Sequence, residues 1–282
     1  MKSLQRAALV AATGLLAVAC TEKKPETKEA PAAAASKPAP AEKAAAELSV
    51  GELVGESGGI KVSKLAGSPK FPDAKIILKS PECNAKVPAK AKFEFEVEGY
   101  ELGAQTVADP FLAASGKGQH IHFIVDNEPY AAYYEPSFEH ELAPGSHIIL
   151  AFLSRSYHES VKSMHVLTRV HVDEKTKKIE NVSLDSAPHL FYSRPKGSYS
   201  GKGAQKLLLD FFLAGVEISK DGYKVEATLD GEKFLLTEWV PYVVEGLPMG
   251  EATVQLRLLD AEGKLVPGMF NDVTRTVKLS AE

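Results

Sequence analysis

Apolar and polar residues alternate through most of the chain from Ile60 onward. In residues 92–98 the alternation is strict, so Phe93, Phe95 and Val97 face one side of a strand while glutamates face the other. Similar runs predict further strands at 119–125, 146–153, 165–172, 223–229, 252–259 and 273–279. No long helix is expected after residue 20. The pattern predicts an all-β protein.

Residue pairs that favour tight turns separate these runs. Asp126-Asn127 and Asp230-Gly231 each follow a predicted strand, and such pairs accept the positive φ angles of two-residue hairpin turns. Short strands joined by turns that contain Gly, Pro, Asn and Asp are typical of a β-sandwich or a barrel.

The predicted strands occur twice in the same order. Residues 118–128 align with 222–232, and residues 142–145 align with 247–250, each pair at nearly the same offset. Such a repeat indicates two copies of one structural unit. We therefore predict two tandem immunoglobulin-like β-sandwich domains. A single larger β structure built from all the strands is the alternative architecture.

The N-terminus has the three parts of a secretory signal. Lys2 and Arg6 precede an apolar stretch at 7–18, which is followed by small residues. The sequence Ala17-Val18-Ala19-Cys20 resembles the lipobox of bacterial lipoproteins. This resemblance implies cleavage before Cys20, diacylation of its sulfur (palmitate) and a membrane anchor. Thr21, rather than Asp, after the cysteine resembles the sorting pattern for the outer membrane.

A spacer follows the cysteine. Between Ala30 and Ala46 there are ten alanines, and residues 21–47 contain no aromatic residue. Such a segment cannot bury enough apolar surface to offset the entropy of ordering. The predicted organisation is a signal peptide (1–19), Cys20 with a disordered tether (20–50), a first sandwich (51–184), an inter-domain segment (185–206) and a second sandwich (207–282).

Charge and motifs exclude several classes of function. The chain has 33 Lys and Arg against 37 Asp and Glu, a net charge of −4, which removes the basic surface that nucleic-acid binding needs. Residues 197–201 resemble a nucleophile elbow except at the centre, where Tyr199 replaces the serine. We therefore expect a non-enzymatic protein without a nucleic-acid partner.

The histidines are concentrated in the first copy of the repeat. All eight lie between residues 120 and 189, and none lies in the second copy from residue 205 on. His120 and His122 are two apart on one strand and so share a face. Immunoglobulin-like topology brings His165 and the loop 154–160, with His158, to the same end of the sheet. These four histidines are the predicted ligands of a divalent metal, Zn or Cu.

Two other functions fit the same region. The first is a module that binds an anion, a phosphopeptide or a glycan through Arg155, Tyr157 and His158, with Glu159 and Arg194 close by. The second is a purely structural or adhesive envelope protein, in which the histidines form an ordinary polar face.

Several segments of the chain resemble one group of bacterial proteins. The segments 119–130, 153–160, 191–197 and 245–250 are similar to those of bacterial envelope lipoproteins that are often labelled phosphopeptide-binding. The resemblance implies a secreted, lipid-anchored β-sandwich protein of the cell envelope. It implies no activity and no ligand.

Overall fold

The computed structural model describes residues 47–107, 110–173, 184 and 187–282. The predicted signal peptide, Cys20 and most of the predicted tether lie outside the described residues. Within the described part, the chain forms strands and one short 3-10 helix, η1 (Gly201–Ala204). None of the helices in this part is long and apolar enough to cross a membrane.

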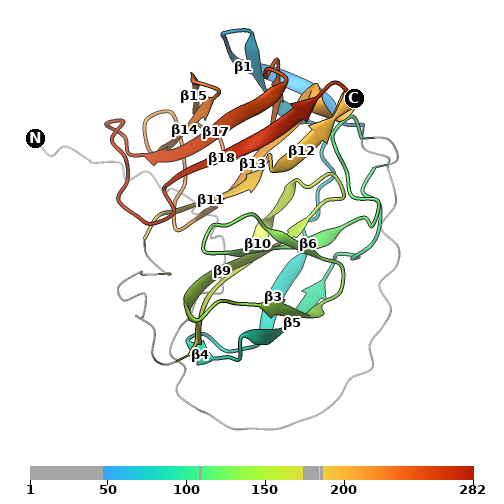
Figure 1. The fold of residues 1–282 in the computed structure, drawn as a ribbon, viewed down its shortest axis with the longest axis vertical. Helices are drawn as coiled ribbons and strands as arrows, with labels where there is room; N and C mark the ends of the chain where they lie inside the picture. Colours follow the sequence, from blue (N-terminus) through green and yellow to red (C-terminus); the bar gives the residue numbers. More distant parts are fainter. Residues whose placement is uncertain (1–46, 108–109, 174–183, 185–186) are drawn as a thin grey trace, which may run out of the picture.

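The first sandwich has two sheets, which Figure 1 shows in its lower half. Their strand orders are β4-β10-β9-β6-β7 and β3-β5-β8. Apolar side chains that alternate along both sheets, among them Phe93, Phe123 and Ile149, fill the space between them. The strands are β3 (Lys75–Ser80), β4 (Ala85–Lys86), β5 (Lys90–Glu98), β6 (His120–Val125), β7 (Ala131–Tyr133), β8 (Ser137–Glu141), β9 (Gly145–Ser154) and β10 (Ser160–Val172).

The second sandwich lies above the first in Figure 1 and again has two sheets. Their strand orders are β1-β2-β16-β13-β11 and β12-β18-β17-β14-β15. The strands are β1 (Ser49–Ser57), β2 (Ile60–Ala66), β11 (His189–Arg194), β12 (Gly197–Ser200), β13 (Lys206–Ala214), β14 (Lys224–Leu229), β15 (Glu232–Leu236), β16 (Tyr242–Glu245), β17 (Gly250–Leu259) and β18 (Asp272–Ser280).

Strand order confirms the predicted fold class of tandem immunoglobulin-like sandwiches. The order β10-β9-β6-β7 is repeated as β18-β17-β14-β15, and a short strand pairs in parallel with the outer strand in both copies. Both predicted hairpin turns are present. Asp126, Asn127, Asp230 and Gly231 have positive φ, as a two-residue hairpin turn requires.

The chain divides between the sandwiches differently from the prediction. The β1–β2 hairpin begins at Ser49, in the predicted tether (20–50), and otherwise lies in the predicted first domain, 51–184; β2, however, pairs with β16 and buries Ile60 and Val62 in the second sandwich. The predicted inter-domain segment, 185–206, contains β11, β12 and η1, which are parts of that sandwich. Contacts far apart in the sequence explain the difference. The open edge of β16 pairs with β2, and buried aromatic side chains hold the segment 185–206 in the second sandwich.

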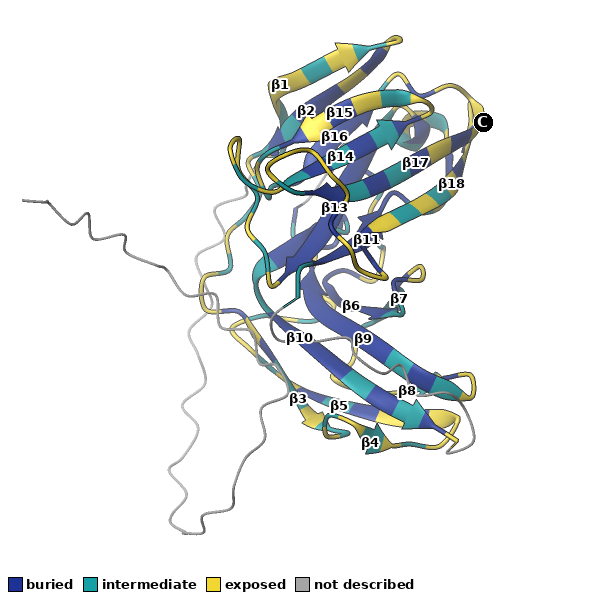
Figure 2. Cartoon of the chain, turned by 90° about the vertical axis from the view of Figure 1, so that its left-hand side faces the viewer, coloured by how far each residue is buried: buried dark blue, intermediate teal, exposed yellow. Residues whose placement is uncertain are grey.

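The two sandwiches are packed against each other through an apolar layer. Strand β9 is apolar on both faces: Ile149 and Ala151 face the first core, while Leu150 and Phe152 face the second sandwich. From the other side, Phe191 and Phe212 fill this layer. Figure 2 shows β11, β13 and the adjoining ends of β9 and β10 as buried. The outer face of the histidine-bearing sheet is therefore an internal boundary and not a solvent-facing surface.

A polar contact also crosses this boundary. The Asp210 carboxylate on β13 is fully buried and accepts hydrogen bonds from the backbone and hydroxyl of Ser160, both at 3.1 Å. It also pairs with the Lys162 ammonium at 2.6 Å. Because a buried carboxylate is tolerated only when it is paired, this contact fixes how the two sandwiches meet.

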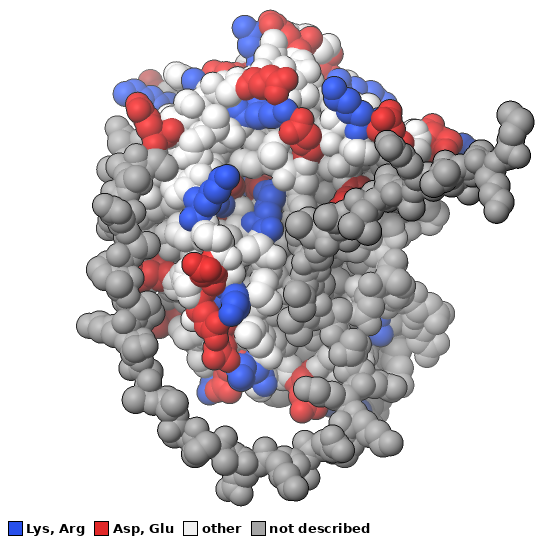
Figure 3. All heavy atoms as spheres, turned by 180° about the vertical axis from the view of Figure 1, so that it is seen from behind, with Lys and Arg blue, Asp and Glu red and all other residues white. Residues whose placement is uncertain are grey.

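Charged side chains of both signs alternate over the surface. Lys75 pairs with Glu98 and Lys79 with Glu96 across β3 and β5, at 3.0 and 2.9 Å. The face shown in Figure 3 has Lys and Arg side by side with Asp and Glu. The predicted glutamate face of β5 is thus a solvated, ion-paired surface.

Candidate metal centre

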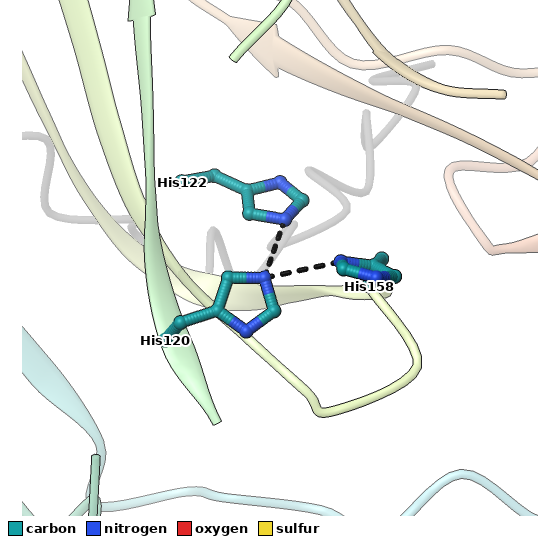
Figure 4. A group of neighbouring side chains, drawn as sticks. All are labelled: His120, His122 and His158. Carbon is teal, nitrogen blue, oxygen red and sulfur yellow. Dashed lines mark hydrogen bonds between the residues drawn. The ribbon is translucent and has the colours of Figure 1, made fainter. Parts of the chain in front are cut away.

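Three of the predicted histidines meet at the boundary between the two sandwiches. His120 and His122 lie on β6 and point from the same face, toward the second sandwich. His158 lies on the loop between β9 and β10, which folds back over the end of β6. In Figure 4 the three rings face one another. His120 and His122 are each 0% exposed, so they do not form the exposed polar face of the structural or adhesive alternative.

The ring nitrogens of this histidine cluster (His120, His122 and His158) converge. His120 Nε2 lies 3.0 Å from His122 Nε2 and 3.1 Å from His158 Nδ1. One nitrogen from each ring can be chosen so that all three lie within 4.8 Å of one another. In a tetrahedral zinc site, Zn–N bonds of about 2.0–2.1 Å place the nitrogens roughly 3.3 Å apart. Two of the three separations are already close to that value.

Contacts on the far side of two rings hold them in place. His120 Nδ1 donates to the Gly118 carbonyl at 2.8 Å, so in the neutral ring Nε2 carries the lone pair. His122 Nδ1 lies 3.2 Å from the Ser193 hydroxyl on β11. Such partners orient the imidazole ligands of metal sites.

Tyr130, between β6 and β7, completes the wall of the site. Its ring stacks on His122 with centroids 3.5 Å apart, and its hydroxyl lies 3.1 Å from His158 Nδ1. Alternation along the sequence cannot reveal this residue, because it lies in a loop and acts through its ring. The only signal is its position in the segment 119–130, which carries the lipoprotein resemblance.

Burial keeps the three imidazoles neutral. Desolvation lowers the pKa of His120 to about 4, and it also lowers the pKa values of His122 and His158. Positive charge on Arg194 and Lys196 lowers them further. Neutral imidazole is the form that binds metal ions, so the three rings are in the protonation state that a metal site requires.

The histidine cluster offers fewer hydrogen-bond acceptors than the contacts between its rings require. His120 Nε2 has one lone pair, but both His122 Nε2 and His158 Nδ1 lie within hydrogen-bonding distance of it. Two donors then compete for one acceptor, or two lone pairs face each other. His158 also has a φ of 72°, which is uncommon for a non-glycine residue and recurs at functional sites. A cation among the nitrogens accepts all three lone pairs at once.

His165, the fourth predicted ligand, lies outside the cluster, and its assignment is corrected. His122 and His165 are both in register with Phe152, which lies on the strand between them. Two strand spacings of about 4.8 Å therefore separate their backbones. The His165 ring packs on Phe212, with centroids 5.0 Å apart. His165 does share a sheet face with His122, as predicted, but it lies two strands away and not beside it.

Three residues of the predicted ligand-binding group are engaged inside the protein. Arg155 pairs with Glu159 at 3.0 Å and donates to the carbonyls of Pro69 and Ser160. Glu159 also accepts from the Tyr157 hydroxyl at 2.8 Å. These contacts anchor the loop that carries His158, so Arg155, Tyr157 and Glu159 position that histidine instead of facing a ligand.

Arg194, the remaining predicted ligand-binding residue, lies close to the cluster. Its guanidinium lies 5.3 Å from the centroid of the Tyr130 ring and donates to the Tyr199 hydroxyl at 2.8 Å. Lys196 lies against the same Tyr130 ring at 3.7 Å from its centroid. Arg194 and Lys196 are thus cations at the edge of the histidine cluster.

Fold and site together define a tandem immunoglobulin-like β-sandwich protein with a buried three-histidine cluster at its inter-sandwich boundary. No family model matches the sequence. No curated protein matches it either.

Solved structures of low sequence identity overlap with most of the chain. The fibronectin(III)-like modules of CbhA from Clostridium thermocellum match 73% of this chain and 95% of their own, at 13% identity and a TM-score of 0.26. The central fibronectin-III array of RIM-binding protein matches 75% and 70%, at 9% identity and 0.24. SGBP-B of Bacteroides ovatus, in complex with a mixed-linkage heptasaccharide, matches 73% and 47%, at 11% and 0.24. Scores at this level add nothing to the strand order that defines the fold.

Proposed function

We propose that this protein is a metal-binding lipoprotein of the bacterial cell envelope, which holds Zn²⁺ or Cu²⁺ at His120, His122 and His158. The observation that carries the proposal is the convergence of three imidazole nitrogens within 4.8 Å in a buried site. Imidazole ligands suit zinc and copper, and the cluster contains no thiolate. Three protein ligands leave one position of a tetrahedral ion open.

Metal binding rearranges few atoms in this proposal. His120 already presents a lone pair on Nε2, because its Nδ1 donates to Gly118. In the metal-bound form His122 coordinates through Nε2, while its Nδ1–H donates to the Ser193 hydroxyl. The role assigned to the protein is binding; no reaction is assigned to it.

We expect the chain to bind one Zn²⁺ or Cu²⁺ with a dissociation constant of about 1 µM or lower. The variants His120→Gln and His158→Asn should each weaken binding at least ~100-fold, because a ligand is lost outright. Asparagine is chosen at 158 because it accepts positive φ. Isothermal titration of the chain from residue 20, carrying Cys20→Ser for solubility, measures these affinities.

His165→Gln is the matched control for this titration. His165 is buried on the same face of the same sheet, beyond Phe152, but is not a member of the cluster. It should leave metal affinity within about twofold of the parent. Equal affinities in all variants, or no binding by the parent below about 0.1 mM, contradict the metal site and favour a purely structural or adhesive protein.

The alternative of an anion, phosphopeptide or glycan module loses support from the site geometry. Arg155 and Tyr157 are committed to Glu159 and to backbone carbonyls within the protein. A ligand has to break a buried ion pair before it reaches them, which is costly. The proposed metal site, in contrast, uses side chains that already face one another.

We further propose that Cys20 is lipidated and anchors the protein in the membrane, with outer-membrane delivery favoured by Thr21. The support is the lipobox-like Ala17-Val18-Ala19-Cys20 after an apolar stretch. A protein with several acyl chains binds membranes durably, since each buried methylene contributes about 0.8 kcal/mol.

Cys20→Ser should move the protein from the membrane fraction to the soluble fraction of bacteria that process lipoproteins. Mass spectrometry of the mature parent chain should show three acyl chains on an N-terminal Cys20. Lipidation uses the Cys20 sulfur, so a lipidated chain cannot form a disulfide between Cys20 and Cys83, the two cysteines of the sequence. A mature chain that carries no lipid and retains an intrachain disulfide contradicts the anchor.

A further inference from the structure

Three cationic side chains lie against the ring of Tyr130, which borders the histidine cluster, or against the ring of Tyr192. They are Arg194 on β11, Lys196 after it and Arg275 on β18. None of the ion pairs among the described residues involves them. Aromatic rings and carbonyls surround them instead: Lys196 donates to the Tyr130 carbonyl, and the Arg275 guanidinium lies 4.3 Å from the centroid of the Tyr192 ring.

Two of these cations are incompletely satisfied. Arg194 is only 8% exposed, and its Nε is buried without a hydrogen-bond partner. Arg275 Nη1 is likewise buried without a partner. Buried cations in proteins are almost always paired with an anion, because the transfer of an unpaired charge from water is costly. The site therefore has unused capacity for negative charge.

Tyr130 joins these cations to the histidines. His122 stacks on its ring at 3.5 Å and Lys196 lies 3.7 Å from its centroid, so the two must be on opposite faces. The Tyr130 hydroxyl lies 3.1 Å from His158 Nδ1, and the Arg194 guanidinium lies against the same ring. Arg194 and the histidine cluster thus contact the same side chain, Tyr130.

The positive charges around the cluster limit which group can serve as the fourth ligand of the metal. Three neutral imidazoles leave a bound Zn²⁺ with its full double charge, and Arg194 and Lys196 repel that charge in a site poor in water. An anion placed between the ion and these side chains is attracted by both. Guanidinium groups favour carboxylates because their N–H donors match the spacing of the two oxygens.

We propose that a small carboxylate serves as the fourth ligand of the metal and that Arg194 holds it beside the Tyr130 hydroxyl, with Lys196 adding to the positive field. This inference rests on the proposed metal site. It makes the protein a receptor for a metal–carboxylate pair. The carboxylate offsets the repulsion between the bare metal ion and the two cationic side chains. The metal ion in turn supplies a coordination bond to the carboxylate.

The test is a zinc titration of the chain with and without acetate, at constant ionic strength. Acetate should raise the apparent zinc affinity of the parent about tenfold. Arg194→Gln should reduce this gain to less than twofold. Without acetate, Arg194→Gln should bind zinc more tightly than the parent, because one repelling charge is removed. A merely structural role for Arg194 predicts the opposite, a loss of affinity in both conditions.

Two further measurements keep the proposal falsifiable if Arg194→Gln folds poorly. Lys196→Met, a change at a half-buried position, should also lower the acetate effect. In the parent loaded with Co²⁺, acetate should alter the visible spectrum, since a new ligand enters the coordination sphere. Zinc binding that is indifferent to acetate, with an unchanged Co²⁺ spectrum, overturns the carboxylate but leaves the metal site intact. Absence of zinc binding under all conditions overturns the metal site itself.

Discussion

A chain that begins at Gly67 should fail to fold its second sandwich, whereas a chain that begins at Glu47 should be as stable as the full-length chain. The shorter chain lacks the β1–β2 hairpin. Ile60 and Val62 of β2 are buried in the second core, and Leu65 is buried nearby. Each such side chain contributes about 1.5–3 kcal/mol, so the loss approaches the whole stability of a typical domain, about 5–15 kcal/mol.

The hairpin also closes a sheet edge. Strand β2 pairs with β16 from Tyr242↔Lys64 to Glu245↔Lys61, and its removal leaves β16 open to aggregation. Soluble yield and urea unfolding of the two chains, both produced without the signal peptide, measure the effect. The removed strands, β1 and β2, belong to the second sandwich and not to the first. Equal unfolding free energies for the two chains therefore contradict the assignment of these strands to the second sandwich.

Acidification should unfold the metal-free protein well above the pH at which its carboxylates protonate. Burial lowers the pKa of His120 and of His165 to about 4, and it lowers those of His122 and His158 as well. In the unfolded chain each of these rings has a pKa near 6.5. Between pH 6.5 and 4 the unfolded state therefore binds more protons than the folded state.

The sign of this effect follows from proton linkage. Stability is fully present above pH 6.5 and falls as the pH drops toward 4, by up to about 1.4 kcal/mol per pH unit for each buried ring. Burial also lowers the pKa of His140, and the five rings together make acid unfolding near pH 5 the expected result. The pKa of His147 is raised by its bond to Asp126, and a raised pKa adds no slope below pH 6.5.

His165→Leu provides the control for acid unfolding. His165 Nε2 is buried without a hydrogen-bond partner and its ring packs on Phe212, so leucine should fit without loss at pH 7. Urea unfolding from pH 7 to 4.5, with a chelator present, should show a slope smaller by up to about 1.4 kcal/mol per pH unit in this variant. An unfolding free energy of the parent that is flat between pH 6.5 and 5 contradicts the neutral, buried state of the histidines.

The candidate site was found only in part from the sequence. The His120–His122 spacing and the absence of histidines from the second copy singled out the correct strand, because the strand period of two fixes which residues share a face. His158 followed from the loop that joins β9 and β10. His165 was misplaced, because sharing a sheet face does not say how many strands lie between two residues.

Sequence by itself determined part of the local structure of this protein: the hairpin turns at Asp126 and Asp230, the repeat of one β unit, and seven of the strands, which are β5, β6, β9, β10, β14, β17 and β18. These features follow from alternation and turn chemistry, which act between residues that are close in the chain. Only the tertiary structure decided that β1–β2 joins the distant sandwich and that the histidine face is buried against β11 and β13. Those outcomes depend on which sheet edges and apolar faces meet, and no short-range pattern contains that information.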